Sequence, residues 1–242
     1  MSGPTEWVFL EETDSTNRVA KELARQGAKH GTAVLARRQS AGRGRMDRRF
    51  FSPEGGLYLS VILRPDIPPE DLPLMTPMAA TAVWRAVEKL TGICLGIKWV
   101  NDLYLGDKKV CGILCEAAGT AVIVGIGLNL KAPEGGFPPD INAAALQVSL
   151  QPSVVAEAIV EELCKGCHGL RSRDFLENYR KDNMVLQREL MVHPVQGAPY
   201  PARGKAIDQR GRLIVETADG NEQVLDSGEV SIGFYTKRSE QA

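Results

Sequence analysis

Residues 37–63 read RRQSAGRGRMDRRFFSPEGGLYLSVIL, an arginine-rich segment followed by an aromatic pair and an apolar run. Six arginines fall within its first thirteen residues, interleaved with Gly42 and Gly44. Guanidinium groups are forked donors that match phosphate oxygens, so the segment predicts a loop that closes over a phosphate-containing ligand. The apolar runs at residues 32–36 and 57–63 predict the two buried strands that carry this loop.

The composition around this loop is that of an ordinary globular protein. The chain has 242 residues, 43% of them apolar, a formal net charge of −1 and a pI near 6.3. The arginine cluster is therefore a local feature, and wholesale binding to nucleic acid is not favoured. The opening residues show no secretory pattern, and no apolar stretch is long enough to span a bilayer. We expect a cytoplasmic protein with no membrane partner.

Five cysteines in a chain without a secretory signal predict reduced thiols. One spacing needs attention, because Cys164-Lys165-Gly166-Cys167-His168 fits the pattern of c-type haem attachment. That pattern is short, and the two cysteines fall at the end of an amphipathic helical repeat, where small apolar thiols are common. We therefore favour buried structural cysteines at this position.

Periodicity divides the chain into a large α/β part and a small β part. In the large part we expect helices capped near Asn17, Thr76 and Ser153 and a fourth over residues 173–181. Strands are expected at residues 6–11, 97–100, 109–116 and 121–130, with turns at 101–107 and 119–120. These turns predict antiparallel pairing within a mixed sheet.

From residue 189 the pattern changes to short alternating segments, and the turn at residues 208–211 predicts a hairpin between two of them. We therefore place a domain boundary near Leu186, with a catalytic domain over residues 1–186 and a small β-barrel over residues 187–242. Neither Gly42-x-Gly44 nor Gly125-x-Gly127 completes a dinucleotide fingerprint, and no P-loop motif occurs.

Four segments, read in order, resemble the biotin protein ligases. They are Asp14-Ser15-Thr16-Asn17, the loop at residues 39–53, Lys98-Trp99-Val100-Asn101-Asp102 with Lys109 to Leu114, and the segment from Gly125 to Asn129. The resemblance continues through GKAIDQRGRLIV and SGEVS and covers nearly the whole chain. Val100 replaces the family's proline, and Phe50 replaces its tryptophan. The fold it implies is α/β (α+β): a mixed, largely antiparallel, class II synthetase-like sheet with flanking helices, then an SH3-like barrel.

The resemblance implies an enzyme that joins biotin to ATP, forms biotinyl-5′-AMP, and passes the biotinyl group to a lysine of a biotin carboxyl carrier protein. The first step brings a carboxylate against an α-phosphate, which requires fixed cations and Mg²⁺. The implied catalytic residues are Lys109, Arg45 and Asp102, and Asp102 is also the candidate Mg²⁺ ligand. From spacing alone, Lys109 could equally be a solvated hairpin lysine, and Asn101-Asp102 a plain turn.

Biotin needs an apolar slot for its rings and buried polar groups for its ureido edge. The residues that the resemblance assigns to biotin are Ser15, Thr16, Asn17, Gln39, Arg43, Gly44, Arg45, Lys109, Gly112, Leu114, Gly125 and Gly127. Those that it assigns to ATP are Arg43, Arg45, Phe50, Asn101 and Asn129. Ser15 and Thr16 could instead serve only as helix caps, and the glycines as strand irregularities.

Two rival functions stay open. A lipoate protein ligase shares the fold and the adenylate chemistry, although its acyl site would be a long apolar tunnel. A nucleic-acid or partner-binding module would use the arginine loop alone. Because the first expected strand begins at about residue 6, we expect no N-terminal winged helix and no DNA binding. A homodimer is compatible with the family, but no interface can be assigned from the sequence.

Overall fold

A computed structural model describes residues 6–232, with the side chain of Asp47 left out. Its main sheet has seven strands in the order β1-β2-β3-β7-β6-β5-β4. The strands are β1 (Trp7–Thr13), β2 (Ala33–Gln39), β3 (Gly56–Leu63), β4 (Gly96–Lys98), β5 (Asp102–Leu105), β6 (Lys108–Ala118) and β7 (Ala121–Asn129). Only β1 and β2 pair in parallel, so the expected mixed and largely antiparallel sheet is confirmed.

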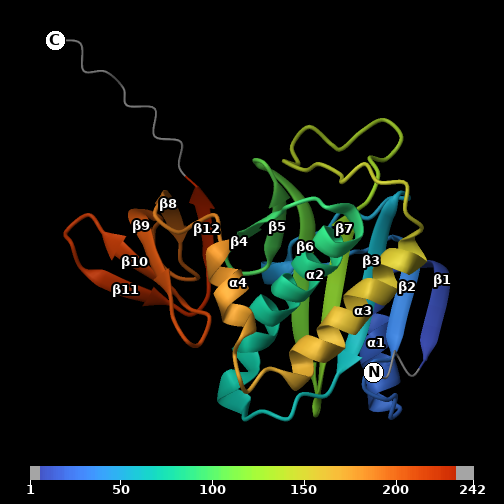
Figure 1. The fold of residues 1–242 in the computed structure, drawn as a ribbon. Helices are drawn as coiled ribbons and strands as arrows, with labels where there is room; N and C mark the ends of the chain where they lie inside the picture. Colours follow the sequence, from blue (N-terminus) through green and yellow to red (C-terminus); the bar gives the residue numbers. More distant parts are fainter. Residues whose placement is uncertain (1–5, 233–242) are drawn as a thin grey trace.

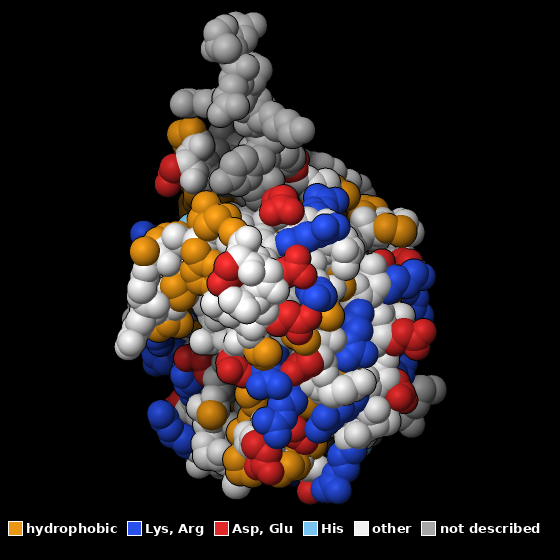
Figure 2. All heavy atoms as spheres, turned by 90° about the vertical axis from the view of Figure 1, so that its left-hand side faces the viewer, with side chains coloured by type: hydrophobic (Ala, Val, Ile, Leu, Met, Phe, Trp, Pro, Cys, Tyr) orange, Lys and Arg blue, Asp and Glu red, His pale blue; other side chains and the backbone are white. Residues whose placement is uncertain are grey.

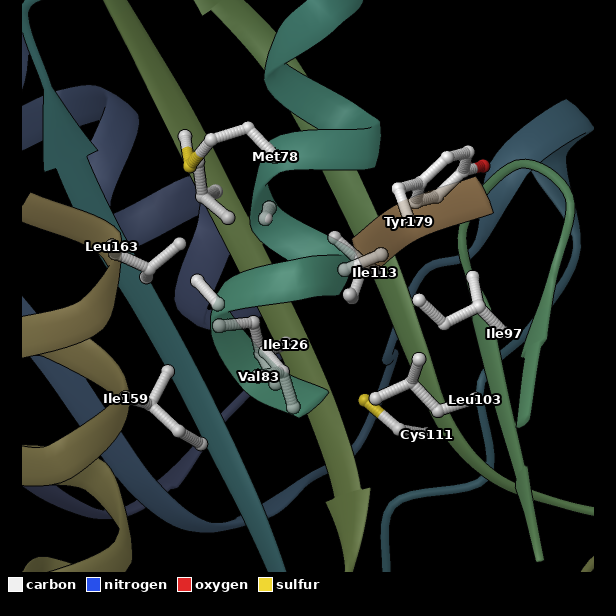
Figure 3. Packing of buried hydrophobic residues seen from close by; sticks show 14 of the residues in the cluster. Met78, Val83, Ile97, Leu103, Cys111, Ile113, Ile126, Ile159, Leu163 and Tyr179 are labelled. Carbon is white, nitrogen blue, oxygen red and sulfur yellow. The ribbon is translucent and has the colours of Figure 1, made fainter. Parts of the chain in front are cut away.

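Helices cover both faces of this sheet (Figure 1). They are α1 (Thr16–Arg25), α2 (Met75–Thr91), α3 (Pro152–His168) and α4 (Phe175–Lys181). Helix α1 packs through Ala20 and Ala24 against Val34, Ile62 and Ile123 on one face. Helices α2 and α3 cover the other face, where Met78 and Val83 meet Ile159 and Leu163 over the strands (Figure 3). Alternate residues of β3 therefore point into two cores, which explains why its sequence is apolar at nearly every position.

The C-terminal part forms a separate antiparallel sheet in the order β11-β10-β9-β8-β12. Its strands are β8 (Glu189–His193), β9 (Tyr200–Ile207), β10 (Leu213–Thr217), β11 (Glu222–Leu225) and β12 (Glu229–Ile232). The small all-β unit and the hairpin turn at residues 208–211 are thus confirmed. The side of the molecule that carries this sheet shows blue and red side chains interspersed (Figure 2), in keeping with the near-zero net charge.

Three local predictions were wrong. Residues 102–105 were expected to belong to a turn, but they form strand β5. The tight turn follows this strand, at Gly106, whose φ is 63°. Thr76 does not cap α2, since the short 3₁₀ helix Pro69–Leu74 leads directly into it. Ser153 does not cap α3 either: Gln151 occupies the N-cap position, with Pro152 in the first turn.

The haem-like spacing falls inside α3, as favoured above. Cys164 and Cys167 are buried against the core, and the ring of His168 contacts the carbonyl of Cys164 one turn earlier. Burial raises the pKa of the Cys167 thiol to about 12, so it is not a reactive thiolate. Within residues 6–232, no helix is both long and apolar enough to cross a membrane.

Candidate active site

One pocket is formed by the arginine loop, the start of α1 and residues of strands β2, β4, β5, β6 and β7. Its cavity measures about 150 Å³. It is lined by all but one of the site residues assigned from the sequence: Ser15, Thr16, Asn17, Gln39, Arg43, Gly44, Arg45, Phe50, Asn101, Asp102, Lys109, Gly112, Leu114, Gly125 and Gly127. The sheet topology accounts for this, because β3, β7 and β6 are neighbours and carry the glycine positions in register.

Asn129 is the exception. Its Nδ2 donates to the carbonyl of Ala144 at 2.9 Å, and it does not line the pocket. The side chain therefore ties the end of β7 to the following loop, and its contact with a nucleotide stays a prediction.

Lys109 and Asp102 form the charged centre of the pocket. Lys109 Nζ lies 2.8 Å from Asp102 Oδ1, and both side chains are largely buried, at 31% and 18% exposed. A β-bulge between Leu103 and Tyr104 shifts the β5–β6 register and pairs Lys109 with Tyr104. Bulges of this kind redirect side chains, and here the shift brings the ammonium diagonally across to Asp102.

The Phe50 ring packs against the backbone of β6 and β7 at two glycines that lack a side chain. Gly112 and Gly127 are paired across β6 and β7, and a Cβ at Gly127 would lie 2.4 Å from the Phe50 ring. Lys109 Nζ is 5.9 Å from the centre of that ring, within the range of a cation–π contact. Glycine at these positions is thus explained by close packing of an aromatic side chain, and any contact of these glycines with a ligand is still a prediction.

The arginine loop is held over the pocket by its own backbone and by contacts outside it. Arg43 and Arg49 form an isolated bridge, and Gly44 N donates to the carbonyl of Arg48 at 2.7 Å. Arg45 Nη1 donates to Asn101 Oδ1 at 3.2 Å, while Asn101 Nδ2 donates to the carbonyl of Ile113 at 2.9 Å. The loop and the β4–β5 connection are therefore linked through Asn101.

Sequence reasoning missed a second charged set at the mouth of the pocket. Arg48 pairs with Glu229, at the start of β12 in the small sheet, and Lys98 lies beside them. Arg48 holds the pKa of the Glu229 carboxyl below its ordinary value, whereas burial lowers the pKa of the Lys98 ammonium. Lys98 belongs to the segment KWVND and Glu229 to the segment SGEVS. These two segments are far apart in the sequence and meet only in the three-dimensional structure.

Ser15 and Thr16 at the start of α1, together with Gln39 of β2, form a polar side of the pocket, which we call the polar wall. Ser15 is the N-cap residue, but its side chain makes no capping hydrogen bond. Thr16 N instead donates to Gln39 Oε1 at 2.9 Å, so a side chain from β2 satisfies one of the free N–H groups of the helix end. Simple side-chain capping therefore does not explain Ser15 and Thr16, and both hydroxyl-bearing residues line the pocket.

As for a metal, no group of three or more His, Cys, Asp or Glu side chains that could hold an ion occurs within residues 6–232. A site formed by one carboxylate and substrate phosphates is the usual arrangement for Mg²⁺, which keeps several waters. Asp102 fits that limited role, because its carboxylate faces the pocket beside Lys109.

Comparison with known proteins gives consistent matches. Residues 9–131 match the model of the biotin/lipoate A/B protein ligase family, and residues 202–233 match the biotin protein ligase C terminal domain. The bifunctional ligase/repressor BirA of Bacillus subtilis is 32% identical over 93% of this chain and 74% of its own length. The biotin–[acetyl-CoA-carboxylase] ligase of Mycobacterium tuberculosis is 28% identical over 95% of this chain and 90% of its own.

Solved structures agree. A biotin protein ligase from Aquifex aeolicus in complex with biotin and ATP superposes with a TM-score of 0.80, at 27% identity, covering 95% of this chain and 99% of its own. A biotin protein ligase from Leishmania major in complex with biotinyl-5-AMP gives a TM-score of 0.67 at 29% identity, covering 93% and 100%. The similarity therefore extends over both sheets.

Proposed function

This chain belongs to the biotin/lipoate A/B protein ligase family and, within it, to the biotin protein ligases, and from that premise we propose that its pocket activates biotin with ATP. The products of this first step are biotinyl-5′-AMP and pyrophosphate. The biotinyl group then passes to a lysine amine of a biotin carboxyl carrier protein, with release of AMP.

The observation that carries the proposal is the position of Lys109 and the arginine loop around one cavity. A carboxylate that approaches an α-phosphate meets like charge, and negative charge grows on the phosphoryl oxygens as the new bond forms. The ammonium of Lys109, which Asp102 holds at 2.8 Å, is suited to bridge the two anions. Arg43 and Arg45 add forked donors for phosphate and carboxylate oxygens.

The polar wall favours biotin over lipoate. Thr16 and Gln39 place hydroxyl and amide groups on the pocket lining, and polar groups of this kind match a ureido ring better than an apolar dithiolane ring. Ser15, Asn17, Gly112, Leu114, Gly125 and Gly127 complete this biotin site, and Phe50, Asn101 and Asn129 are assigned to ATP. A side-by-side assay of adenylate formation from biotin and from lipoate, with labelled ATP, separates the two functions.

Mg²⁺ would be held by the ATP phosphates, with Asp102 as the protein ligand. When bound, it neutralises phosphate charge in the first half-reaction. The chain's own contribution is to keep the Asp102 carboxylate in place through Lys109, and in the second half-reaction to hold the acyl group while the carrier lysine attacks.

The direct test is to incubate the protein with biotin, MgATP and a carboxylase carrier domain and to measure the carrier's mass. We expect a gain of one biotinyl group that requires ATP and the carrier's target lysine. An unmodified carrier, together with no pyrophosphate release, would rule out the proposed function. Gel filtration with biotin tests whether the chain forms a homodimer, and an electrophoretic shift assay with DNA tests the expected lack of DNA binding.

A further inference from the structure

We propose that Lys98, at the end of β4, is a further catalytic residue, whose ammonium contacts the pyrophosphate that leaves in the first half-reaction and stabilises the charge that develops on it. The inference rests on the proposed function, because it assumes that biotin and ATP react in this pocket. It gives a role to the second charged set at the mouth of the pocket, to which Lys98 belongs together with Glu229 and Arg48.

Lys98 lies at the end of a row of paired residues that crosses four strands. Gly127 of β7 pairs with Gly112 of β6, which in turn pairs with Asp102 of β5. Asp102 then pairs with Lys98 of β4. Residues that pair directly in an antiparallel sheet place their side chains on the same face. All four residues line the pocket, so the row runs along one side of the cavity from the glycines to the mouth.

The order of this row matches the order of the groups along the reacting molecules. The two glycines belong to the proposed biotin site, and Lys109, which Asp102 holds at 2.8 Å, is assigned to the biotin carboxylate and the α-phosphate. Neighbouring strands are about 4.8 Å apart, so Lys98 lies one strand beyond Asp102. The leaving phosphates extend from the α-phosphate on the side opposite to the attacking carboxylate. Lys98 is therefore placed for the leaving group and not for the carboxylate.

The sheet and an aromatic ring hold the Lys98 side chain in the pocket. Its neighbours Ile97 and Trp99 are buried in the core, so Lys98 projects from the opposite face of β4. Lys98 Nζ lies 5.5 Å from the centre of the Tyr104 ring, within the range of a cation–π contact. The ammonium is thus in place before a ligand arrives, and stabilisation of a developing charge is most effective when the stabilising group is fixed beforehand.

The protein balances the charge of Lys98 incompletely. Burial lowers the pKa of its ammonium, whereas Asp102 and Glu229 favour the charged form. Each of these carboxylates already has a cation of its own, since Asp102 pairs with Lys109 and Glu229 pairs with Arg48. Lys109 and Arg48 in turn disfavour the charge on Lys98. An anion that enters the pocket beside Lys98 therefore removes an electrostatic cost, and pyrophosphate carries several negative charges.

The chemistry of the first half-reaction shows where this ammonium acts. A carboxylate oxygen of biotin forms a bond to the α-phosphorus, and the bond from that phosphorus to the oxygen that bridges the α- and β-phosphates breaks. The electron pair stays on the bridging oxygen, so pyrophosphate gains negative charge and no proton has to move. A cation fixed beside the leaving group stabilises this transition state more than it stabilises bound ATP. In the second half-reaction pyrophosphate has gone, so Lys98 has no such role there.

Lys98→Met is the test variant, because it keeps an apolar stem and removes the charge. Adenylate formation is measured as single-turnover pyrophosphate release from biotin and MgATP, and transfer is measured separately with biotinyl-5′-AMP supplied to enzyme and carrier domain. We expect Lys98→Met to slow adenylate formation about 10²-fold. The KM for biotin and the rate of transfer should stay within about twofold of wild type. Lys98→Arg keeps a cation and should recover at least about tenfold of the lost rate.

Two ATP analogues give a readout that a general structural defect would not change. In one, CH₂ replaces the oxygen between the β- and γ-phosphates, and in the other CF₂ replaces it, which makes the leaving group less basic. Without its cation the reaction should depend more strongly on the basicity of the leaving group. We therefore expect the ratio of the CF₂ rate to the CH₂ rate to be about fivefold larger in Lys98→Met than in wild type.

Lys108→Met is the matched control, because it removes an exposed lysine charge from the start of β6. It should keep the wild-type rates of both half-reactions and the wild-type ratio for the two analogues. Thermal melting of each variant verifies that it is folded.

An unchanged analogue ratio in folded Lys98→Met, or an equal loss in both half-reactions, would overturn the assignment of Lys98 to the leaving group. A loss confined to transfer would also overturn it, and would point to proton removal from the carrier lysine. In each of these cases wild-type protein still makes biotinyl-5′-AMP, and the proposed function stands. Wild-type protein that makes no adenylate from biotin would refute the proposed function itself.

Discussion

At the scale of single residues, Lys108 and Lys109 are neighbours in sequence with different surroundings. Lys108 is exposed at the start of β6, whereas Lys109 lies between Asp102 and the Phe50 ring. The spacing of residues could not separate a solvated hairpin lysine from a site lysine, because the bulge that turns Lys109 inward has no signature in the sequence.

Lys109→Gln should reduce the rate of adenylate formation by about 10²–10³, because it removes a fixed charge from the place where negative charge develops. Single-turnover pyrophosphate release measures this step without the carrier protein. Lys108→Gln is the matched control and should keep wild-type activity. Equal loss in both variants would point to a general effect of charge on the β5–β6 hairpin.

Gly125 shows why a glycine is needed in the middle of a strand. A Cβ built there would lie 2.1 Å from Asn17 Oδ1, so any larger residue would displace Asn17. We expect Gly125→Ala to raise the KM for biotin and to lower the free energy of unfolding by about 1–3 kcal/mol. Urea unfolding and biotin titration measure the two effects. Gly169→Ala, which meets no atom closer than 3.6 Å, should leave both values nearly unchanged.

At the scale of elements, β12 of the small sheet contacts the arginine loop through Glu229 and Arg48. The folded-state pKa of Glu229 lies below its ordinary 4.5, chiefly because of the hydrogen bond from Arg48. Its stabilising contribution is therefore present above about pH 4.5 and is lost as the pH falls through the lower folded-state pKa. The contribution is small, since the Arg48 side chain is 63% exposed.

Glu229→Gln should therefore lower the free energy of unfolding by about 0.5–1 kcal/mol at pH 7 and by progressively less as the pH falls below that of an ordinary glutamate. Urea unfolding of wild type and variant along a pH series measures the difference. Glu222→Gln, on β11 of the same sheet, is the control carboxylate. A pH-independent difference would mean that the effect arises from packing and not from the ion pair.

Most elements could be predicted because their signals are local. The apolar period of β3, the helical spacing of α1 and the Asp208–Gly211 turn are each contained within a few residues. The hydrogen bond of Asn17 with Glu116 could not be predicted, because the two residues are 99 positions apart and meet only after β7 and β6 pair. Strand β5 could not be predicted for a different reason. Asn and Asp are typical turn residues, so Asn101-Asp102 indicates a turn, but Asp102 pairs with Gly112 of β6 and is part of the sheet.

At the scale of the whole molecule, the β9–β10 turn is a second contact between the small sheet and the large unit, besides the pair of Glu229 and Arg48. The β9–β10 turn presents backbone carbonyls to side chains of the large unit: Arg180 Nε donates to Ile207 O at 2.8 Å and Nη2 to Asp208 O at 2.9 Å. Trp99 Nε1 donates to Gly211 O at 3.0 Å. Because Trp99 lies two residues before Asn101, this hydrogen bond connects the small sheet to the segment that carries Asn101 and Asp102.

Two sheets joined in this way should unfold together. Arg180→Met keeps an apolar stem but leaves two partly buried carbonyls without their donor. At about 1–2 kcal/mol for each lost hydrogen bond, the free energy of unfolding should fall by about 2–4 kcal/mol. We expect wild-type protein to give one calorimetric transition, and the variant to melt earlier, with the small sheet separating from the main transition. Arg171→Met, an exposed arginine paired with Asp66, should melt like wild type. If the variant loses stability but still melts in one transition, Arg180 does not couple the two sheets. The coupling would then be assigned to the hydrogen bond of Trp99 and the ion pair of Glu229 with Arg48.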